Sequence, residues 1–322
     1  MELIIKTTAA CNMACKFCAA ANLKTIEQKK IDPRISQVVD TINPNGIIVT
    51  GGDALCCSPE WYYELFERFP DIPVDFVTNL KDFYLNPDKW TDIFRRKNIR
   101  VCTSFNYGNT RMWNKDTVYD ESAFRKVMEL FEKKIGWLPM FISVIDYDNE
   151  WSVKKTVELA KSLGTQCRLN NAMKLGRQGV YYPRSKMFNY WLDIIEKGDE
   201  AYEINCLERD KGICPFNTSL LCKSTIRALY INEENELRYQ NCEDRLNNEE
   251  QNILLDTGVV DPIEEIIPPE KTINPDKCQY CELYRLCNAC ETNREQAKKY
   301  APNYCSDMLK NKDRIINAGW KL

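Results

Sequence analysis

Short β-rich runs alternate with amphipathic stretches from residue 2 to about residue 197. Apolar residues in the amphipathic stretches recur every three to four positions, the period of a helix that buries one face. Three of these stretches begin with a capping residue followed by proline, at Asp32-Pro33, Ser58-Pro59 and Asn86-Pro87. The β-rich runs cover residues 3–7, 46–50, 74–78, 101–105, 140–146 and 166–170. The pattern predicts six βα units in succession.

Successive βα units predict an α/β fold with a parallel sheet and right-handed crossovers. In folds of this kind, functional residues gather at the C-terminal ends of the strands. A Gly-Gly pair, Gly51-Gly52, follows the second predicted strand directly, and Ser104 lies at the end of the fourth. A Gly-Gly pair alone is typical of an ordinary turn.

The pattern changes after a predicted helix around residues 185–195. Nine of the 16 cysteines lie beyond it, at positions 206, 214, 222, 242, 278, 281, 287, 290 and 305. Two β-like runs, 226–231 and 236–241, predict a hairpin that brings Cys222 and Cys242 together. We therefore predict two domains, 1–200 and 201–322, of which the second binds metal.

Composition limits the classes of function. The 322 residues carry a net charge of −3 with no long run of one sign. This charge pattern does not resemble the basic surface of a nucleic-acid-binding protein. No apolar run approaches the roughly 18 residues of a membrane span, and the start lacks the features of a signal peptide. We expect a cytoplasmic protein without membrane contact. Thiols stay reduced there, so 16 cysteines indicate metal binding rather than disulfides.

Cys11, Cys15 and Cys18 follow the first predicted strand in a CxxxCxxC spacing. Three thiolates on so short a loop can bind three irons of a [4Fe–4S] cluster and leave the fourth iron open. The alternative is a zinc knuckle or a set of buried thiols. Zinc sites usually pair CxxC with another CxxC or with histidines, and this chain has no histidine.

The CxxxCxxC spacing, with the aromatic Phe17 before the third cysteine, resembles the signature of the radical SAM superfamily. The resemblance implies that the open iron binds S-adenosyl-L-methionine (SAM) and that an electron from the cluster splits SAM to a 5′-deoxyadenosyl radical. Six βα units match the partial (β/α)6 TIM-like barrel of that family.

The resemblance also implies SAM contacts at strand ends. Gly51-Gly52-Asp53 resembles the family's GGE motif, with Asp53 in place of the usual Glu. Ser104 and Arg111 occupy positions where related enzymes hold the SAM ribose or carboxylate. At the sixth strand, Asn170 and the Gly176-Arg177 pair resemble a turn of the peptide-modifying branch, although an exposed turn arginine is the alternative for Arg177.

The late cysteines resemble the SPASM domain, an auxiliary iron–sulfur module, with one residue fewer in the last gap of the run. The resemblance assigns the ligands of a first auxiliary [4Fe–4S] cluster to Cys214, Cys222, Cys242 and Cys290. It assigns those of a second cluster to Cys278, Cys281, Cys287 and Cys305. Cys206 is the alternative to Cys214, and two four-thiolate zinc sites are the alternative to both clusters. Cys102 and Cys167, inside predicted strands, are predicted packing residues.

Enzymes of this type mostly modify peptides. We therefore expect a radical SAM oxidoreductase that acts on a ribosomally synthesised peptide by oxidation, by thioether or C–C cross-linking, or by epimerisation. A flavodoxin- or ferredoxin-like reductant is implied. Because the first predicted strand begins near residue 2, we expect leader recognition to need a separate leader-binding protein or another surface. Glu243 and Asp244, next to Cys242, are candidates for the catalytic base, as in sulfatase-type maturases; the alternative is two solvated acids.

Two other functions remain open at this point. One is a sulfatase-type formylglycine maturase or a small-alcohol oxidase. The other is a non-catalytic iron–sulfur or electron-transfer protein, against which the Gly51-Gly52-Asp53 turn and the open-site cysteine spacing speak.

Overall fold

The computed structural model describes residues 2–209, 229–239, 251–252, 255–256, 259–260, 281–283, 286 and 297–320. The chain forms two compact units. The first comprises Met1–Phe141, Leu175–Arg177 and Ser224–Pro268, and the second comprises Ile142–Lys174, Gln178–Lys223 and Pro269–Leu322. Both units take residues from either side of position 200. The division into domains at that position stays a prediction.

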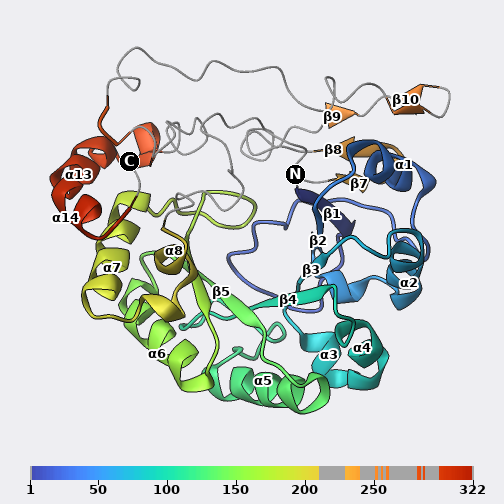
Figure 1. The fold of residues 1–322 in the computed structure, drawn as a ribbon, viewed down its shortest axis with the longest axis horizontal. Coiled ribbons are helices and arrows are strands. Elements are labelled where there is room, and N and C mark those ends of the chain that lie inside the picture. Colours follow the sequence, from blue (N-terminus) through green and yellow to red (C-terminus); the bar gives the residue numbers. More distant parts are fainter. Residues whose placement is uncertain are drawn as a thin grey trace. The chain divides into compact units, whose positions relative to one another are not determined.

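A parallel sheet forms the centre of the first unit (Figure 1). Its first four strands are β1 (Glu2–Thr8), β2 (Gly46–Gly51), β3 (Val74–Val77) and β4 (Ile99–Ser104). They pair in chain order, with Ile4 opposite Ile48 between β1 and β2 and Phe76 opposite Val101 between β3 and β4. The predicted strands are confirmed with bounds that shift by one or two residues.

Helices cover the outer side of these strands in Figure 1. They are α1 (Pro33–Ile42), α2 (Pro59–Arg68), α3 (Lys81–Leu85), α4 (Pro87–Phe94) and α5 (Glu121–Ile135). Their predicted apolar stripes are buried, and aromatic rings join them to the sheet: Phe94 lies 5.3 Å from Phe76 and 5.7 Å from Phe131 between ring centroids. The five-residue α3 was not predicted, because it is too short to display a helical period.

A hairpin from late in the sequence extends the same sheet. β7 (Leu229–Ile231) and β8 (Leu237–Tyr239) are antiparallel, which confirms the predicted hairpin, and β9 (Gln251–Asn252) follows β8. The unpredicted feature is that β7 also pairs with β1, in parallel, with Leu229 opposite Ile5. All three β7 side chains are buried. A second small sheet pairs β10 (Leu255–Asp256) with β11 (Val259–Val260).

The second unit contains the remaining described strands and helices. β5 (Met140–Ile145) leads into it, and it continues through α6 (Val153–Leu163), β6 (Cys167–Asn171), α7 (Arg184–Glu196), α8 (Ile204–Leu207), α13 (Tyr304–Lys310) and α14 (Lys312–Asn317). The rings of Trp191 and Phe188 pack against Trp320 in its core. Cys167 is fully buried, which confirms its packing role, whereas Cys102 is only partly buried.

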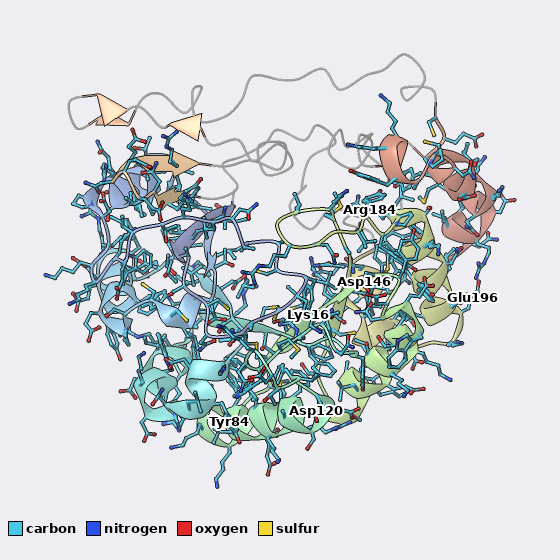
Figure 2. The ribbon with its side chains drawn as sticks, turned by 180° about the vertical axis from the view of Figure 1, so that it is seen from behind. Lys16, Tyr84, Asp120, Asp146, Arg184 and Glu196 are labelled. Atoms are coloured by element: carbon cyan, nitrogen blue, oxygen red, sulfur yellow. The ribbon has the colours of Figure 1, made fainter. Side chains whose placement is uncertain are left out.

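Helix ends agree with the sequence signals. Gly164 ends α6 with φ +73°, the left-handed conformation that glycine adopts most readily. Asp32 caps α1, and Asp120 caps α5 by accepting a hydrogen bond from the backbone of Ala123 at 2.8 Å. Figure 2 labels Asp120 at the start of that helix. No helix among the residues that the structure describes is long and apolar enough to cross a membrane.

The capping bond of α5 leads to a stability prediction. Asp120→Ala leaves the Ala123 N–H without its partner and is expected to lower the free energy of unfolding by about 1 kcal/mol. Glu129→Ala, at an exposed position in the middle of the same helix, is the control and should change it by less than about 0.5 kcal/mol. Urea denaturation measures both, and equal losses would contradict the capping role.

Candidate functional site

The three early cysteines lie on the loop between β1 and α1, to which the labelled Lys16 of Figure 2 also belongs. This loop has no regular secondary structure near the cysteines, so its backbone groups need partners elsewhere. The backbone of Lys16 donates to Thr110 O at 2.8 Å, and that of Ala14 donates to Met112 O at 3.2 Å. The segment after β4 therefore holds the middle of the loop.

Two further strand ends hold the loop from other sides. The backbone N–H of Asp53, after β2, donates to Ala10 O at 2.8 Å, and that of Arg177 donates to Cys18 O at 2.9 Å. The predicted GGD and Gly-Arg turns are thus backbone neighbours of the cysteine loop.

The motif glycines are required by this close approach. A Cβ atom on Gly52 would lie 2.3 Å from the carbonyl oxygens of both Ala9 and Ala10, and one on Gly176 would lie 2.5 Å from Cys18 O. Gly176 and Gly51 also have positive φ angles, +59° and +145°. The resemblance assigns Gly51 and Gly52 to SAM. In the structure, the contacts that exclude a side chain at Gly52 and Gly176 are with the cysteine loop itself, and those at Gly51 are with Thr8 at the end of β1.

A cavity of about 420 Å³ opens beside the loop, within the usual range for small-molecule sites. Cys11, Cys15, Cys18 and Phe17 line it from the loop. The other predicted residues that line it are Gly52, Asp53, Ser104, Arg111 and Arg177. Gly51 and Asn170 are not among the lining residues; Asn170 lies on β6 in the second unit.

Arg111 is a buried cation whose hydrogen bonds go to neutral groups. Its guanidinium donates to Ser104 Oγ at 2.9 Å and to Asn106 Oδ1 at 3.1 Å, and it lies 5.1 Å from the centre of the Phe17 ring. Arg111 is only 6% exposed, and burial lowers the pKa of its guanidinium. Because a buried charge is costly without an opposite charge, the site favours an anionic group on the cavity side of Arg111.

Asp53 is buried and already bonded within the protein. Its carboxylate accepts hydrogen bonds from Asn79 N at 2.6 Å, Thr78 Oγ1 at 2.9 Å and Leu55 N at 3.0 Å. Burial raises the pKa of Asp53, and these hydrogen bonds oppose that shift. Asp53 therefore ties the end of β2 to the end of β3, beside the cavity.

The turn that follows β3 was not predicted from the sequence. Leu80 in this turn is fully buried and has φ +60°, a left-handed conformation that costs a bulky residue roughly 1–3 kcal/mol. Lys81 Nζ donates to Asn12 O at 2.7 Å and also to Trp113 O. Burial lowers the pKa of Lys81, while the nearby Cys11 and Cys56 sulfurs raise it. No sequence motif marks this turn.

The donor set suits an iron–sulfur cluster. Among the described residues, no three His, Cys, Asp or Glu side chains converge on a point that one metal ion could occupy. A [4Fe–4S] cube instead offers a separate iron to each thiolate, so its ligands need only line the same cavity, as these three do. Burial raises the pKa of Cys11 to about 11, so iron binding would release its proton.

Most of the predicted auxiliary ligands lie outside the described residues: Cys214, Cys222, Cys242, Cys278, Cys287 and Cys290. Glu243 and Asp244 also lie outside them. Cys281 is partly exposed, and Cys305 is exposed on α13. Cys206 is fully buried in α8, and its thiol donates to Trp191 O at 3.6 Å.

Comparison with known proteins gives two solved structures of interest. No family model and no curated protein sequence matches the chain. A crystal structure of Streptococcus suis SuiB bound to precursor peptide SuiA matches with a TM-score of 0.62 at 15% identity, over 93% of this chain and 74% of that one. SuiB bound to S-adenosylmethionine matches with a TM-score of 0.61 at 15% identity, over 93% and 75%.

These matches bear on the fold. They confirm the predicted α/β class with a partial (β/α)6 TIM-like barrel, and at the level of fold they confirm the resemblance inferred from the cysteine loop.

Close packing at Gly52 leads to a second prediction. Gly52→Ala forces a methyl group into two backbone carbonyls, so we expect a loss of about 1–3 kcal/mol in unfolding free energy. Gly179→Ala is the matched control, since a Cβ there meets nothing within 4 Å. Thermal unfolding measures the stability of both variants. Wild-type behaviour of Gly52→Ala would refute the packing argument.

Proposed function

We propose that this chain is a radical SAM enzyme. The observation that carries the proposal is that Cys11, Cys15 and Cys18 line the same cavity as the buried, cationic Arg111. Three thiolates suit a cluster with one open iron, and Arg111 suits an anionic part of the ligand bound next to it. The fold shared with SAM-bound SuiB supports the same proposal.

Bound together, the cluster and SAM would supply a 5′-deoxyadenosyl radical that abstracts hydrogen from a substrate. The residues of this chain bind and orient. Cys11, Cys15 and Cys18 hold the cluster, and the guanidinium of Arg111 binds the SAM carboxylate or ribose together with Ser104. The backbone around Gly52 and Asp53 receives the SAM amino group, and Arg177 contributes a second cation at the rim. Asn170 stays a further candidate contact.

We further propose a peptide substrate. Support comes from SuiB, whose structure with precursor peptide SuiA shares the fold, and from the late cysteine spacing. The substrate is a ribosomally synthesised peptide, and a flavodoxin- or ferredoxin-like protein supplies electrons. Two auxiliary [4Fe–4S] clusters complete the enzyme as an oxidoreductase. The burial of Cys206 favours Cys214 as the fourth ligand of the first auxiliary cluster.

Iron content tests the cofactor assignment. The anaerobically reconstituted protein is expected to bind about twelve irons, the sum of three cubes. The Cys11→Ala, Cys15→Ala, Cys18→Ala triple variant should lose SAM cleavage and keep roughly eight. The release of 5′-deoxyadenosine, followed by chromatography, measures cleavage. Cleavage by the triple variant would refute the proposed function, and about four irons in the wild type would refute the auxiliary clusters.

A second experiment tests the base. Glu243→Gln or Asp244→Asn should keep the clusters and 5′-deoxyadenosine formation but lower peptide product by about 10²-fold or more, because a positioned base contributes on that scale. Mass spectrometry of a candidate peptide measures the product, and a loss of two hydrogens, no mass change or a new cross-link separates the reaction types. Unchanged product in both variants would remove these residues from the mechanism and favour epimerisation.

A further inference from the structure

The side chain of Asn79, after β3, reaches the first cysteine of the loop. Its amide nitrogen lies 3.7 Å from Cys11 Sγ and 3.0 Å from Asn12 Oδ1. Its amide oxygen accepts a hydrogen bond from Lys81 N at 2.8 Å. Because a backbone N–H only donates, this last bond fixes the orientation of the amide: the NH2 end faces Cys11. The two N–H bonds of this amide therefore have two acceptors, Cys11 Sγ and Asn12 Oδ1.

Backbone contacts hold Asn79 in this position. Its own N–H donates to the buried carboxylate of Asp53 at 2.6 Å, and the left-handed Leu80 follows it directly. Lys81, the next residue, donates to Asn12 O at 2.7 Å on the same loop. A strained, over-determined turn beside a cavity is typical of a functional site. Here the turn places polar contacts from Asn79 and Lys81, on either side of Leu80, against the loop around Cys11.

The contact distinguishes Cys11 from the other two cysteines. Within the described part of the chain, the sulfurs of Cys15 and Cys18 accept no side-chain hydrogen bond, whereas Cys11 faces the Asn79 amide. Hydrogen bonds to cluster sulfurs are one of the means by which proteins set reduction potentials. An N–H donor stabilises the added negative charge when the cluster takes up one electron, so it raises the potential.

We propose that Asn79 is a positioning residue that donates a hydrogen bond to the Cys11 thiolate and thereby raises the reduction potential of the cluster on this loop. The inference rests on the proposed function, since it requires that Cys11 binds the cluster. The one-electron donor remains the external flavodoxin- or ferredoxin-like protein. A higher potential makes that first reduction less demanding for the donor.

The test compares two variants with a matched control. Asn79→Asp keeps the shape and the acceptor for Lys81 N but replaces the donor to Cys11. Asn79→Ser withdraws the donor without adding charge, because the serine side chain is one bond shorter and its hydroxyl does not reach Cys11 Sγ. Asn98→Asp is the control: its amide also bonds carbonyl oxygens, of Pro70 and Ile72, but it precedes β4 at the opposite end of the strands. Each is studied as the full, anaerobically reconstituted chain.

The readout is the midpoint potential of one cluster. A redox titration monitored by electron paramagnetic resonance follows the signal of the reduced cluster on this loop. This is the signal that is absent from the Cys11/Cys15/Cys18 triple alanine variant. We expect this midpoint to shift to more negative values in both Asn79 variants, with wild-type iron content, and to stay unchanged in Asn98→Asp. If Asn79→Asp retains too little iron, the neutral Asn79→Ser variant decides.

Two other outcomes are distinguishable. A wild-type midpoint in the Asn79 variants, or an equal shift in Asn98→Asp, would overturn the role of Asn79 and leave the proposed function intact. If the wild-type protein shows no signal that depends on the three cysteines, both the role of Asn79 and the proposed function are overturned.

Discussion

The site depends on one constraint: a loop without secondary structure must find partners for its own backbone. Around Cys11, Cys15 and Cys18 these partners come from the ends of several different βα units, through Asp53, Thr110, Met112 and Arg177. Each bond is worth only about 1 kcal/mol, but an unpaired buried group costs more, so the loop has few alternative conformations. The glycines at 52 and 176 are what permit this closeness.

Electrostatics follow from the same packing. The loop brings three thiols into the same cavity as the buried Arg111 and close to the partly buried Lys81. Two cations in this site are unfavourable unless a negative charge lies nearby. Thiolates in the same site are likewise unfavourable unless cations lie nearby. The cavity is therefore suited to receive negative charge, from the cysteines and from a ligand, and each charge lowers the cost of the others.

Much of this was predictable from local patterns. The capping residues and apolar stripes located α1, α2, α4 and α5, and the CxxxCxxC spacing located the loop, because these signals lie within a few consecutive residues. The pairing of β7 with β1 was not predictable, since a three-residue strand says nothing about its neighbour. Nor was the turn at Asn79 and Leu80: a left-handed leucine contradicts its own conformational preference, and only the tertiary contacts around it explain it.

The bonds that shape the cysteine loop also determine when it can form. Ala14 and Lys16 pair with residues that follow β4, and Cys18 pairs with Arg177, which follows β6. During synthesis the loop emerges first, yet the groups that give it its shape emerge more than two βα units later. Contacts between residues so far apart in the sequence form slowly, because the entropy of closing the intervening loop must be offset first. The cysteine loop therefore takes its shape only after the segments that follow β4 and β6 have packed against it, and the iron of the proposed cluster would be delivered to a site that this packing has prepared.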